Sequence, residues 1–384
     1  MNILFYDMGS FTYKDLLANL AKMGHCCKPF MYHFPNIYDD AYFCDCLHKE
    51  LCTNTYDIVF SVNFFPLVAK VCNNNHIRYV SWVYDSPLAE GLFPYFEYDT
   101  NYIFLFDRLE AEEYLQRGYT RIFHLPLAAD TERISKQLGT PSSNTHYNCD
   151  VSFIGQLYTS TLDSLLYISP PYIKGYIEGI LQAQRRIYGY DFIDELIPDT
   201  ILDEINRSNT SVFPNATKLN RRGLVHAIHK DITNQERIFL LEELGVHFKT
   251  FCYMKDSYSF QSPIKLGGSV DYYSKMPVIF RESKLNLCPT LRSIRSGIPL
   301  RALDIMAAGG TLFSNYQTEL AEHFEDGVDV IMYSSMDDAI EKAFFYLQND
   351  SIRKQIALNG YQKVKESFNY PKQLTTLFET LASR

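Results

Sequence analysis

The fold of this 384-residue chain is constrained most by the stretch Ser296-Gly297-Ile298-Pro299-Leu300-Arg301-Ala302-Leu303-Asp304-Ile305-Met306-Ala307-Ala308-Gly309-Gly310. Its pattern predicts a loop, a short helix that ends at the paired glycines, and a strand over residues 311–314. Arg301 and Asp304 stand three residues apart, so both lie on one face of the predicted helix. A basic and an acidic group behind a glycine-bearing loop suit a ligand with phosphates at one end and hydroxyls at the other, as in a sugar nucleotide.

The alternative interpretation of Arg301 and Asp304 is an ordinary surface ion pair, worth a few tenths of a kcal/mol. The small side chains of Ala302, Ala307 and Ala308 instead favour close packing of this helix. We therefore expect the charged pair to point into a cleft.

The loop before this stretch is rich in hydroxyl and guanidinium groups. An apolar run over residues 285–288 predicts a strand, and after it come Thr290, Arg292, Ser293, Arg295 and Ser296. Arginine binds phosphates through bidentate hydrogen bonds, so the loop suits a diphosphate. A solvated basic loop is the alternative, and the sequence leaves both interpretations open.

Strand and helix patterns alternate in both halves of the chain, which predicts an α/β protein with parallel sheets covered by helices. The expected strands span residues 3–7, 29–34, 58–62, 79–84, 102–106 and 122–127, and then 150–155, 246–253, 285–288, 311–314 and 329–333. A polar, turn-rich segment over residues 139–145 places one domain at 1–140 and the next at 141–368. Residues 162–244 form a mostly helical stretch within the second domain.

Two α/β halves create a cleft, and ligands of such sheets bind at the carboxyl ends of the strands. Five residues that directly follow expected strands are candidates to line it: Gly9, Asp85, Gly155, Thr290 and Asn315. Glu319 follows on the loop after Asn315, although it also fits an ordinary helix start.

Two short segments of the first half carry further candidates. Gly9 and Ser10 either present backbone N–H groups to a ligand or simply turn the chain. Asp85, close to Trp82 in the sequence, either orients or deprotonates an acceptor hydroxyl or belongs to an Asp-Ser-Pro turn.

The composition argues against several classes of protein. A net charge of -9 argues against a nucleic-acid surface. The nine cysteines follow no zinc spacing, which favours reduced thiols in a cytoplasmic protein. The N-terminus is not typical of a signal peptide, and no apolar run approaches the roughly 20 residues of a membrane span. Because no Asp-x-Asp motif occurs, we expect no metal site for a diphosphate and no cofactor.

Residues 286–319 resemble the C-terminal half of the CgeB-like glycosyltransferases, a family named after a spore maturation protein and grouped with the GT-B transferases of group 1. The family's central signature is similar to residues 292–301 and continues over 304–310 and 315–320; the resemblance is strong over 272–332 and diffuse over 162–244. Trp82, Asp85-Ser86-Pro87 and residues 124–128 look like parts of the domain that usually precedes this half.

The resemblance implies a GT-B fold with two Rossmann-like domains that face a cleft, and a C-terminal helix, residues 369–384, packed on the N-terminal domain. It implies a metal-independent glycosyltransferase of the hexosyltransferase type. The expected substrates are a nucleotide sugar, in particular a UDP-sugar, and a protein or glycan acceptor. A nucleotide-sugar epimerase and a non-catalytic partner of a transferase are the alternatives. Residues 162–244 leave acceptor selection and a homodimer interface open.

The resemblance also assigns roles to residues. In group 1 transferases the second Glu of an E-x7-E arrangement binds the ribose, and Asp304 stands at that position. The first position falls at Ser296, whose hydroxyl cannot supply the charge of a carboxylate. The diphosphate is assigned to Arg292, Ser293 and Arg301. The other expected roles are Asp85 as the catalytic residue, donor-side positions at Thr290, Gly155, Asn315 and Glu319, and acceptor-side positions at Gly9, Ser10 and Trp82.

Overall fold

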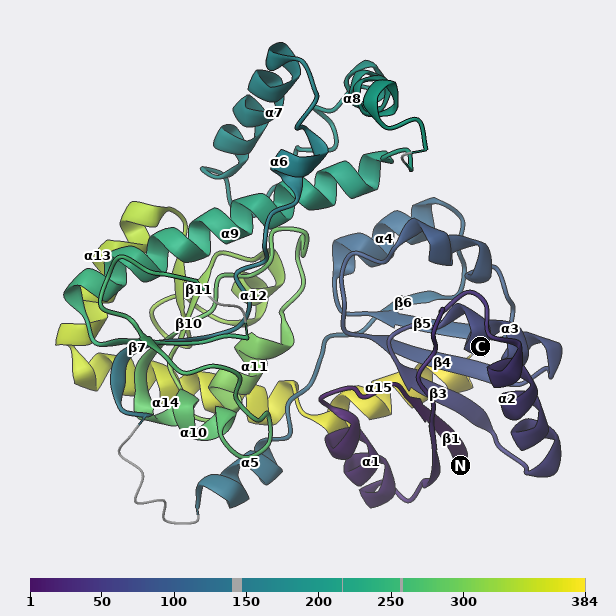
Figure 1. The fold of residues 1–384 in the computed structure, drawn as a ribbon. Helices are drawn as coiled ribbons and strands as arrows, with labels where there is room; N and C mark the ends of the chain where they lie inside the picture. The colour runs from purple at the N-terminus through teal and green to yellow at the C-terminus, as the bar shows by residue number, and fades with distance from the viewer. Residues whose placement is uncertain (140–146, 216, 256–257, 384) are drawn as a thin grey trace. The chain divides into compact units, whose positions relative to one another are not determined.

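The computed structural model describes residues 1–139, 147–215, 217–255 and 258–383, and these form two α/β units (Figure 1). Unit 1 comprises Met1–Thr131, Gly297–Leu303 and Val364–Arg384, and unit 2 comprises Glu132–Ser296 and Asp304–Lys363. The expected domain boundary between residues 140 and 141 lies outside the described residues.

Unit 1 is built on a parallel sheet with the strand order β2-β1-β3-β4-β5-β6. Its strands are β1 (Asn2–Asp7), β2 (Cys26–Met31), β3 (Ile58–Val62), β4 (Arg78–Val83), β5 (Asn101–Leu105) and β6 (Ile122–His124). Ile3 pairs in register with Ile58, and Val59 with Tyr79. The inner strands are buried along nearly their whole length, which explains their continuous apolar sequences.

The helices of unit 1 are α1 (Tyr13–Lys22), α2 (Ala41–Thr53), α3 (Pro66–Asn74), the 3-10 helix η1 (Glu90–Tyr95), α4 (Arg108–Gln116) and α15 (Tyr370–Ala382). Phe43, Val68 and Tyr114 bring α2, α3 and α4 into one core with residues of the sheet. α1 lies beside α15, so the C-terminal helix packs within unit 1.

Unit 2 contains a second parallel sheet, with the order β12-β11-β10-β7-β8-β9. Its strands are β7 (Cys149–Ile154), β8 (Thr250–Tyr253), β9 (Lys265–Leu266), β10 (Ser283–Leu287), β11 (Leu312–Asn315) and β12 (Ile331–Tyr333). Every pair of neighbouring strands runs parallel, from β9 through to β12. The two parallel sheets with flanking helices confirm the predicted α/β fold class.

The helices of unit 2 are α5 (Thr131–Leu138), α6 (Leu162–Leu165), α7 (Pro171–Gln184), α8 (Asp199–Val212), α9 (Arg221–His247), α10 (Met276–Glu282), α11 (Leu300–Ala307), α12 (Thr318–His323), α13 (Met336–Gln348) and α14 (Asp350–Ser367), the first turn of α11 being grouped with unit 1. No helix in the described part of the chain combines the length and apolarity that a membrane span needs.

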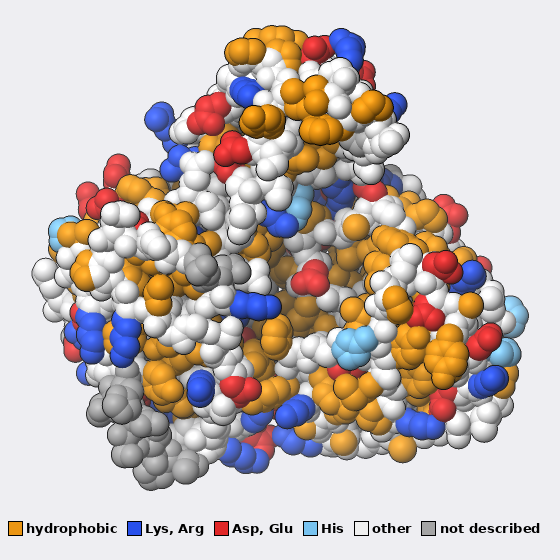
Figure 2. Space-filling model, viewed as in Figure 1, with side chains coloured by type: hydrophobic (Ala, Val, Ile, Leu, Met, Phe, Trp, Pro, Cys, Tyr) orange, Lys and Arg blue, Asp and Glu red, His pale blue; other side chains and the backbone are white. Residues whose placement is uncertain are grey.

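The 27-residue helix α9 connects two hydrophobic cores of unit 2 (Figure 1). Leu240 and Leu244 belong to the core over the sheet, whereas Leu224 and Ile228 belong to a separate core with α6, α7 and α8. This helical group leaves several large apolar side chains exposed: Tyr167, Tyr172, Tyr176, Tyr190, Leu196 and Phe213. Hydrophobic side chains are visible on the surface at the top of Figure 2.

The structure differs from the sequence interpretation at two expected strands and at two helices, α2 and α5. β2 covers Cys26–Met31 rather than residues 29–34, and Pro29 is tolerated there because β2 is an edge strand. The strand expected over 246–253 is wrong in its first half, because α9 continues to His247 and Val246 is exposed on its last turn. The sequence interpretation assigned no element to the segments that form α2 and α5; α5 is short, and most of its residues are polar.

Candidate functional site

In each sheet the chain first adds strands on one side of its initial strand, β1 or β7, and then crosses over to add strands on the other side. In unit 1 this crossover point lies between β1 and β3, and in unit 2 it lies between β7 and β10. Ligands of doubly wound α/β sheets bind beyond the carboxyl ends of the strands at such points. The loops that follow these strands, two in each unit, are therefore the candidate positions for a ligand.

In unit 2, Arg237 of α9 braces the two loops at this point. Its guanidinium donates to the carbonyl oxygens of Gln156, after β7, and of Pro289, after β10. The same group lies 4.6 Å from the ring centroid of Tyr158. Because these bonds fix both loops to one helix, Arg237 positions the candidate donor site, a role that sequence analysis did not predict.

Arg292 was predicted to bind a diphosphate, but its guanidinium is already paired within unit 2. Arg292 Nε donates to Glu236 Oε2 at 3.0 Å, and Nη2 donates to the other carboxylate oxygen. The guanidinium carbon lies 3.8 Å from the ring centroid of Tyr188, whose hydroxyl donates to Glu236 at 2.8 Å. The side chains of Arg292 and Glu236 are 8% and 2% exposed, so the structure places the Arg292 guanidinium in a buried ion pair, and we propose that Arg292 positions the loop rather than binds a phosphate.

Three predicted donor-side residues, Thr290, Asn315 and Glu319, take part in two hydrogen-bonded pairs of residues. The backbone N–H of Thr290 donates to Asn315 Oδ1 at 2.6 Å, which ties the loops after β10 and β11 together. Ser296 Oγ donates to Glu319 Oε1 at 2.7 Å, and the N–H of Glu319 donates back to the carbonyl of Ser296. The buried carboxylate of Glu319 thus lies directly against Ser296, the position at which the family pattern has a carboxylate of its own.

Asp304 is almost fully buried in the second turn of α11, where its Oδ1 accepts a hydrogen bond from the hydroxyl of Tyr272 at 3.0 Å. Arg301 is half-buried one turn earlier, and Ser293 is buried in the loop after β10. Gly155 follows β7, and a Cβ there would come within 2.9 Å of the Phe153 ring, so its role is close packing.

A small cavity of about 30 Å³ lies beside these loops, and Arg292, Arg295 and Asn315 are among its lining residues. His229 of α9 and Asp191 of the helical group also line it, with His229 Nε2 2.9 Å from Asp191 Oδ2. Burial opposes ionisation of Asp191, but the hydrogen bond and charge of His229 outweigh it and lower the pKa of this carboxyl, with a smaller contribution from Arg295.

His229 is one of four polar residues that lie on the same face of α9, together with Thr233, Glu236 and Arg237. Thr233 Oγ1 accepts the N–H of Arg292 at 3.0 Å, so this face holds the loop after β10 at several points. All four side chains are buried. The signal that sequence analysis missed is this spacing of buried polar groups at intervals of four, three and one.

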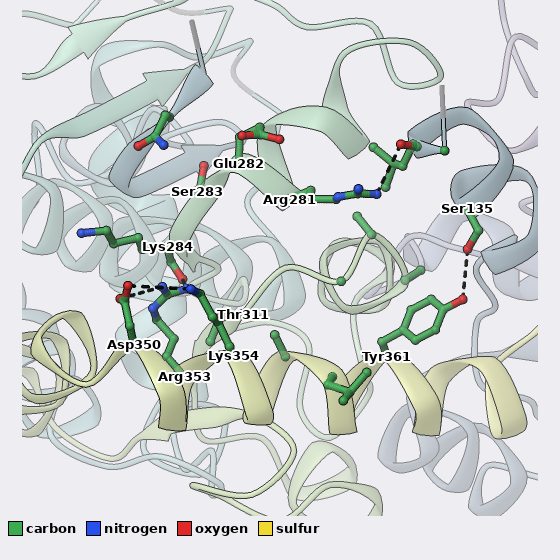
Figure 3. Close-up of a pocket in the computed structure, with 18 residues that line it drawn as sticks. Ser135, Arg281, Glu282, Ser283, Lys284, Thr311, Asp350, Arg353, Lys354 and Tyr361 are labelled. Carbon is green, nitrogen blue, oxygen red and sulfur yellow. Dashed lines mark hydrogen bonds and ion pairs between the residues drawn. The ribbon is translucent and has the colours of Figure 1, made fainter. Parts of the chain in front are cut away.

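A much larger cavity of unit 2, of about 620 Å³, lies at the opposite edge of the sheet (Figure 3). It adjoins the amino ends of β10 and β11, and none of the predicted donor residues lines it. Two of its cationic side chains are paired: Arg353 donates to Asp350 at 2.8 Å, as Figure 3 shows, and Lys284 lies 2.9 Å from Asp150, which is outside the lining. Its position and pairing make it a weaker candidate than the carboxyl edge.

In unit 1, a cavity of about 390 Å³ lies at the carboxyl ends of β1 and β3, where the predicted residues Gly9, Ser10 and Asp85 come together. The carboxylate of Asp7 accepts hydrogen bonds from the N–H groups of Gly9 and Ser10, both at 3.0 Å, and from Ser10 Oγ at 2.7 Å. Gly9 has a φ of +94°, a conformation that favours glycine. The turn therefore holds Asp7 in place at the cavity wall.

Asp85 lies at the mouth of this cavity, open to solvent but with protein atoms closely packed around its carboxylate. Asn63 Nδ2 donates to Asp85 Oδ2 at 2.7 Å, and Asn63 itself adopts a φ of +65° after β3. Burial raises the pKa of Asp85, although the hydrogen bond from Asn63 opposes the rise. A carboxylate with a raised pKa at a cavity mouth is placed as a general base.

Glu110 of α4 supports the segment that follows Asp85. It accepts hydrogen bonds from Ser86 Oγ and from the N–H of Leu88, both at 2.7 Å. Burial raises the pKa of Glu110, and these hydrogen bonds counteract the rise. Asn63 and Glu110 thus hold Asp85 and the segment after it in place, through contacts that sequence analysis did not predict.

Trp82 was predicted on the acceptor side, and the structure places its side chain in the core of unit 1. Its side chain is fully buried, its indole N–H donates to the carbonyl of Leu125 at 3.4 Å, and its ring packs edge-to-face against Tyr370 of α15. Side chains alternate between the faces of β4, so Trp82 enters the core under α15 rather than the cavity.

Within the described residues, no group of three or more His, Cys, Asp or Glu side chains is arranged to hold a metal ion. His226, on the turn of α9 before His229, has a pKa that burial and the nearby charge of Lys230 lower to about 4. It is therefore neutral at physiological pH.

Comparisons with known protein families and solved structures find proteins to which this chain is similar. Residues 234–379 match the family described as Glycosyl transferase-like. This segment contains the loops after β10 and β11, helix α11 and the second half of α9. No curated protein sequence matches the chain.

Among solved structures, Anabaena Alr3699/HepE in complex with UDP-glucose is similar over 100% of both chains, with a TM-score of 0.55 and 12% identity. Sucrose-phosphate synthase (tll1590) from Thermosynechococcus elongatus is similar over 100% of this chain and 99% of its own, with a TM-score of 0.53 and 12% identity. A glycosyltransferase from Rickettsia africae ESF-5 is similar over 99% of this chain and 97% of its own, with a TM-score of 0.52 and 10% identity. At these identities the likeness shows the fold, which is GT-B.

Proposed function

We propose that this protein is a glycosyltransferase that uses a nucleotide sugar as its donor. The observation that carries the proposal is that the Glycosyl transferase-like match, residues 234–379, falls on the segments that build the carboxyl edge of unit 2. Because one structure of similar fold holds UDP-glucose, we propose a UDP-sugar, and in particular a UDP-hexose, as the donor.

Helix α11 and the loops of unit 2 carry the groups that such a donor requires. Asp304 is proposed to accept hydrogen bonds from the ribose hydroxyls, for which it must exchange its bond to Tyr272. Arg295 and Arg301 are proposed to bind the diphosphate, because the guanidinium of Arg292 is committed to Glu236. Their positive charge would stabilise the negative charge that develops on the leaving diphosphate.

Unit 1 has the groups that an acceptor requires. In the proposed reaction Asp85 takes the proton of an acceptor hydroxyl as its oxygen bonds to the anomeric carbon of the donor sugar. The bond from that carbon to the diphosphate breaks at the same time, and the nucleoside diphosphate leaves. A positioned base contributes typically about 10²- to 10⁴-fold to such a step. We propose that no metal ion takes part, since the arginines supply the positive charge.

Three finer assignments also stay proposals. The chain is assigned to the CgeB-like transferases on residues 292–301 and 304–310, within a cytoplasmic setting. The acceptor is assigned to proteins or glycans. A homodimer through the helical group is supported by its exposed tyrosines, and sedimentation of the purified protein tests it.

Titration with UDP and a hydrolysis assay with UDP-glucose test the proposal together. Wild-type protein is expected to bind UDP and to release it slowly from UDP-glucose, also in excess EDTA. Asp304→Asn should weaken UDP binding, whereas Tyr272→Phe, the matched control, keeps the carboxylate and should retain it. Equal binding of UDP by wild type and Asp304→Asn would remove Asp304 from the donor site. Conversion of UDP-glucose to another UDP-sugar would indicate an epimerase instead.

A further inference from the structure

The cavity of unit 1 combines fixed negative charge with apolar walls. Asp7 and Asp85 both line it, and no Lys, Arg or His occurs among its described lining residues. The imidazole of His33 lies beside Gly9, 3.6 Å from the place of a Cβ there, but does not line the cavity. The carboxylates at this cavity therefore disfavour an acceptor with a negative charge.

Asp7 contributes a charge that cannot move away from a ligand. Its side chain is buried in the protein, and three hydrogen bonds from Gly9 and Ser10 hold both of its oxygens. Asp85 adds a second carboxylate, held by Asn63. An anion placed in the cavity would face both carboxylates and would be repelled.

Apolar side chains form the rest of the cavity wall. Ile37, Phe64, Leu88 and Leu92 all line it, and three of the four are buried in the protein. A cavity of this kind, largely apolar with a few placed polar groups, is typical of sites for small organic molecules. Its apolar wall would leave part of a wholly polar ligand without hydrogen-bond partners.

We infer that the acceptor of this enzyme is an uncharged compound in which a hydroxyl-bearing sugar is joined to an apolar group, as in an aryl or alkyl glycoside. The hydroxyl lies at Asp85, and the apolar group packs against Phe64, Leu88 and Leu92. Acceptors that carry a carboxylate or phosphate near the reacting sugar are rejected. This inference rests on the proposed function, because it identifies the acceptor of the same reaction.

A pair of glycosides that differ only in charge tests this selection. The probes are p-nitrophenyl β-D-glucopyranoside and p-nitrophenyl β-D-glucuronide, and binding of each to the full chain is measured by calorimetry or saturation-transfer NMR. Wild-type protein is expected to bind the neutral glycoside at least about tenfold more tightly than the glucuronide. Equal binding, tighter binding of the glucuronide, or no binding of the neutral glycoside up to about 10 mM would overturn the inference.

Ala89 offers a matched pair of variants, because it lines the cavity, is exposed and has no side-chain hydrogen bond to lose. Ala89→Lys adds a positive charge and should reduce the preference for the neutral glycoside by about fivefold or more. Ala89→Gln adds comparable bulk without charge and should leave the preference unchanged. The same reduction in both variants would show that bulk rather than charge sets the preference, which would contradict the inference.

Hydrolysis of UDP-glucose without any acceptor separates this inference from the proposed function. If the donor is hydrolysed but the glucuronide binds as well as the neutral glycoside, the acceptor inference fails alone. If the neutral glycoside binds selectively but none of the common nucleotide sugars is turned over, the proposed function fails while the selectivity of the cavity is confirmed.

Discussion

Replacing Arg292 by methionine separates a structural role of this residue from a direct role in donor binding. In the structure the guanidinium makes two hydrogen bonds to Glu236 and lies over the ring of Tyr188. Both charged side chains are almost fully buried, at 8% and 2% exposure. Arg292→Met leaves the Glu236 carboxylate with the hydroxyl of Tyr188 as its remaining partner among these groups.

The expected cost follows from leaving a buried charge without its partner. Removing one member of a buried ion pair destabilises a protein by about 3–5 kcal/mol. For a domain of roughly 150–250 residues, each kcal/mol lowers the melting temperature by about 2–4 °C, so we expect the transition of unit 2 to fall by roughly 6–20 °C. The double variant Arg292→Met/Glu236→Gln removes the stranded charge and should recover at least half of that loss.

Differential scanning calorimetry measures these shifts, and titration with UDP measures donor binding in the same samples. Arg295→Met is the comparison variant, since Arg295 lines the same cavity as Arg292 and is proposed to bind the diphosphate. Arg295→Met should weaken UDP binding. An Arg292→Met protein with an unchanged melting temperature and no UDP binding would refute the assignment of Arg292 as a positioning residue.

Three further predictions concern other groups. Asp85→Asn should lower kcat/KM by about 10²- to 10⁴-fold. Because the pKa of Asp85 is raised, the wild-type rate should begin to fall at a higher pH, as the pH is lowered, than for an ordinary aspartate. This fall of the rate at acid pH should be absent in the variant. Asp304→Asn should weaken UDP binding by roughly tenfold or more, as expected for a lost hydrogen bond to a charged group, whereas Tyr272→Phe should not; equal affinities in all three proteins would contradict this. His226 has a folded-state pKa of about 4, below its value of about 6.5 in the unfolded chain, so stability is fully present above pH 6.5 and is lost as the pH falls toward 4. Unfolding of His226→Gln by urea should show a smaller change over that pH range.

The fold was predictable from the sequence because the inner strands carry continuous apolar runs. Residues 58–62 were expected as a buried strand, and β3 has these bounds. The same pattern located the turns after the strands, and the structure brings Gly9, Ser10 and Asp85 to one cavity. Such predictions succeed because the carboxyl ends of parallel strands meet at one edge of a sheet.

The partners of the predicted site residues were not predictable, because they lie far away in the sequence. Glu236 is 56 residues from Arg292, and nothing in the local sequence indicates that the two charges neutralise each other. Asn63 reaches Asp85 across 22 residues and depends on an unusual backbone conformation after β3. Burial of both faces of a strand likewise hid the fact that Trp82 points toward α15.

At Ser296 the sequence has a hydroxyl where the family pattern has a carboxylate, and the structure places another carboxylate beside it. Glu319, predicted only as a donor-side residue after β11, places its carboxylate 2.7 Å from Ser296 Oγ. A carboxylate thus lies against the hydroxyl at this position, although it comes from a different loop. The reciprocal hydrogen bond from the N–H of Glu319 shows that the two loops are held together here.

The most direct test of the account is to measure release of nucleoside diphosphate from a panel of common nucleotide sugars, with and without p-nitrophenyl β-D-glucopyranoside. The account predicts that at least one UDP-sugar is consumed, that the glycoside accelerates release and appears in a glycosylated product by mass spectrometry, and that Asp85→Asn abolishes the acceleration. If wild-type protein releases no nucleoside diphosphate from any donor above the level of Asp85→Asn, the proposed glycosyl transfer is contradicted.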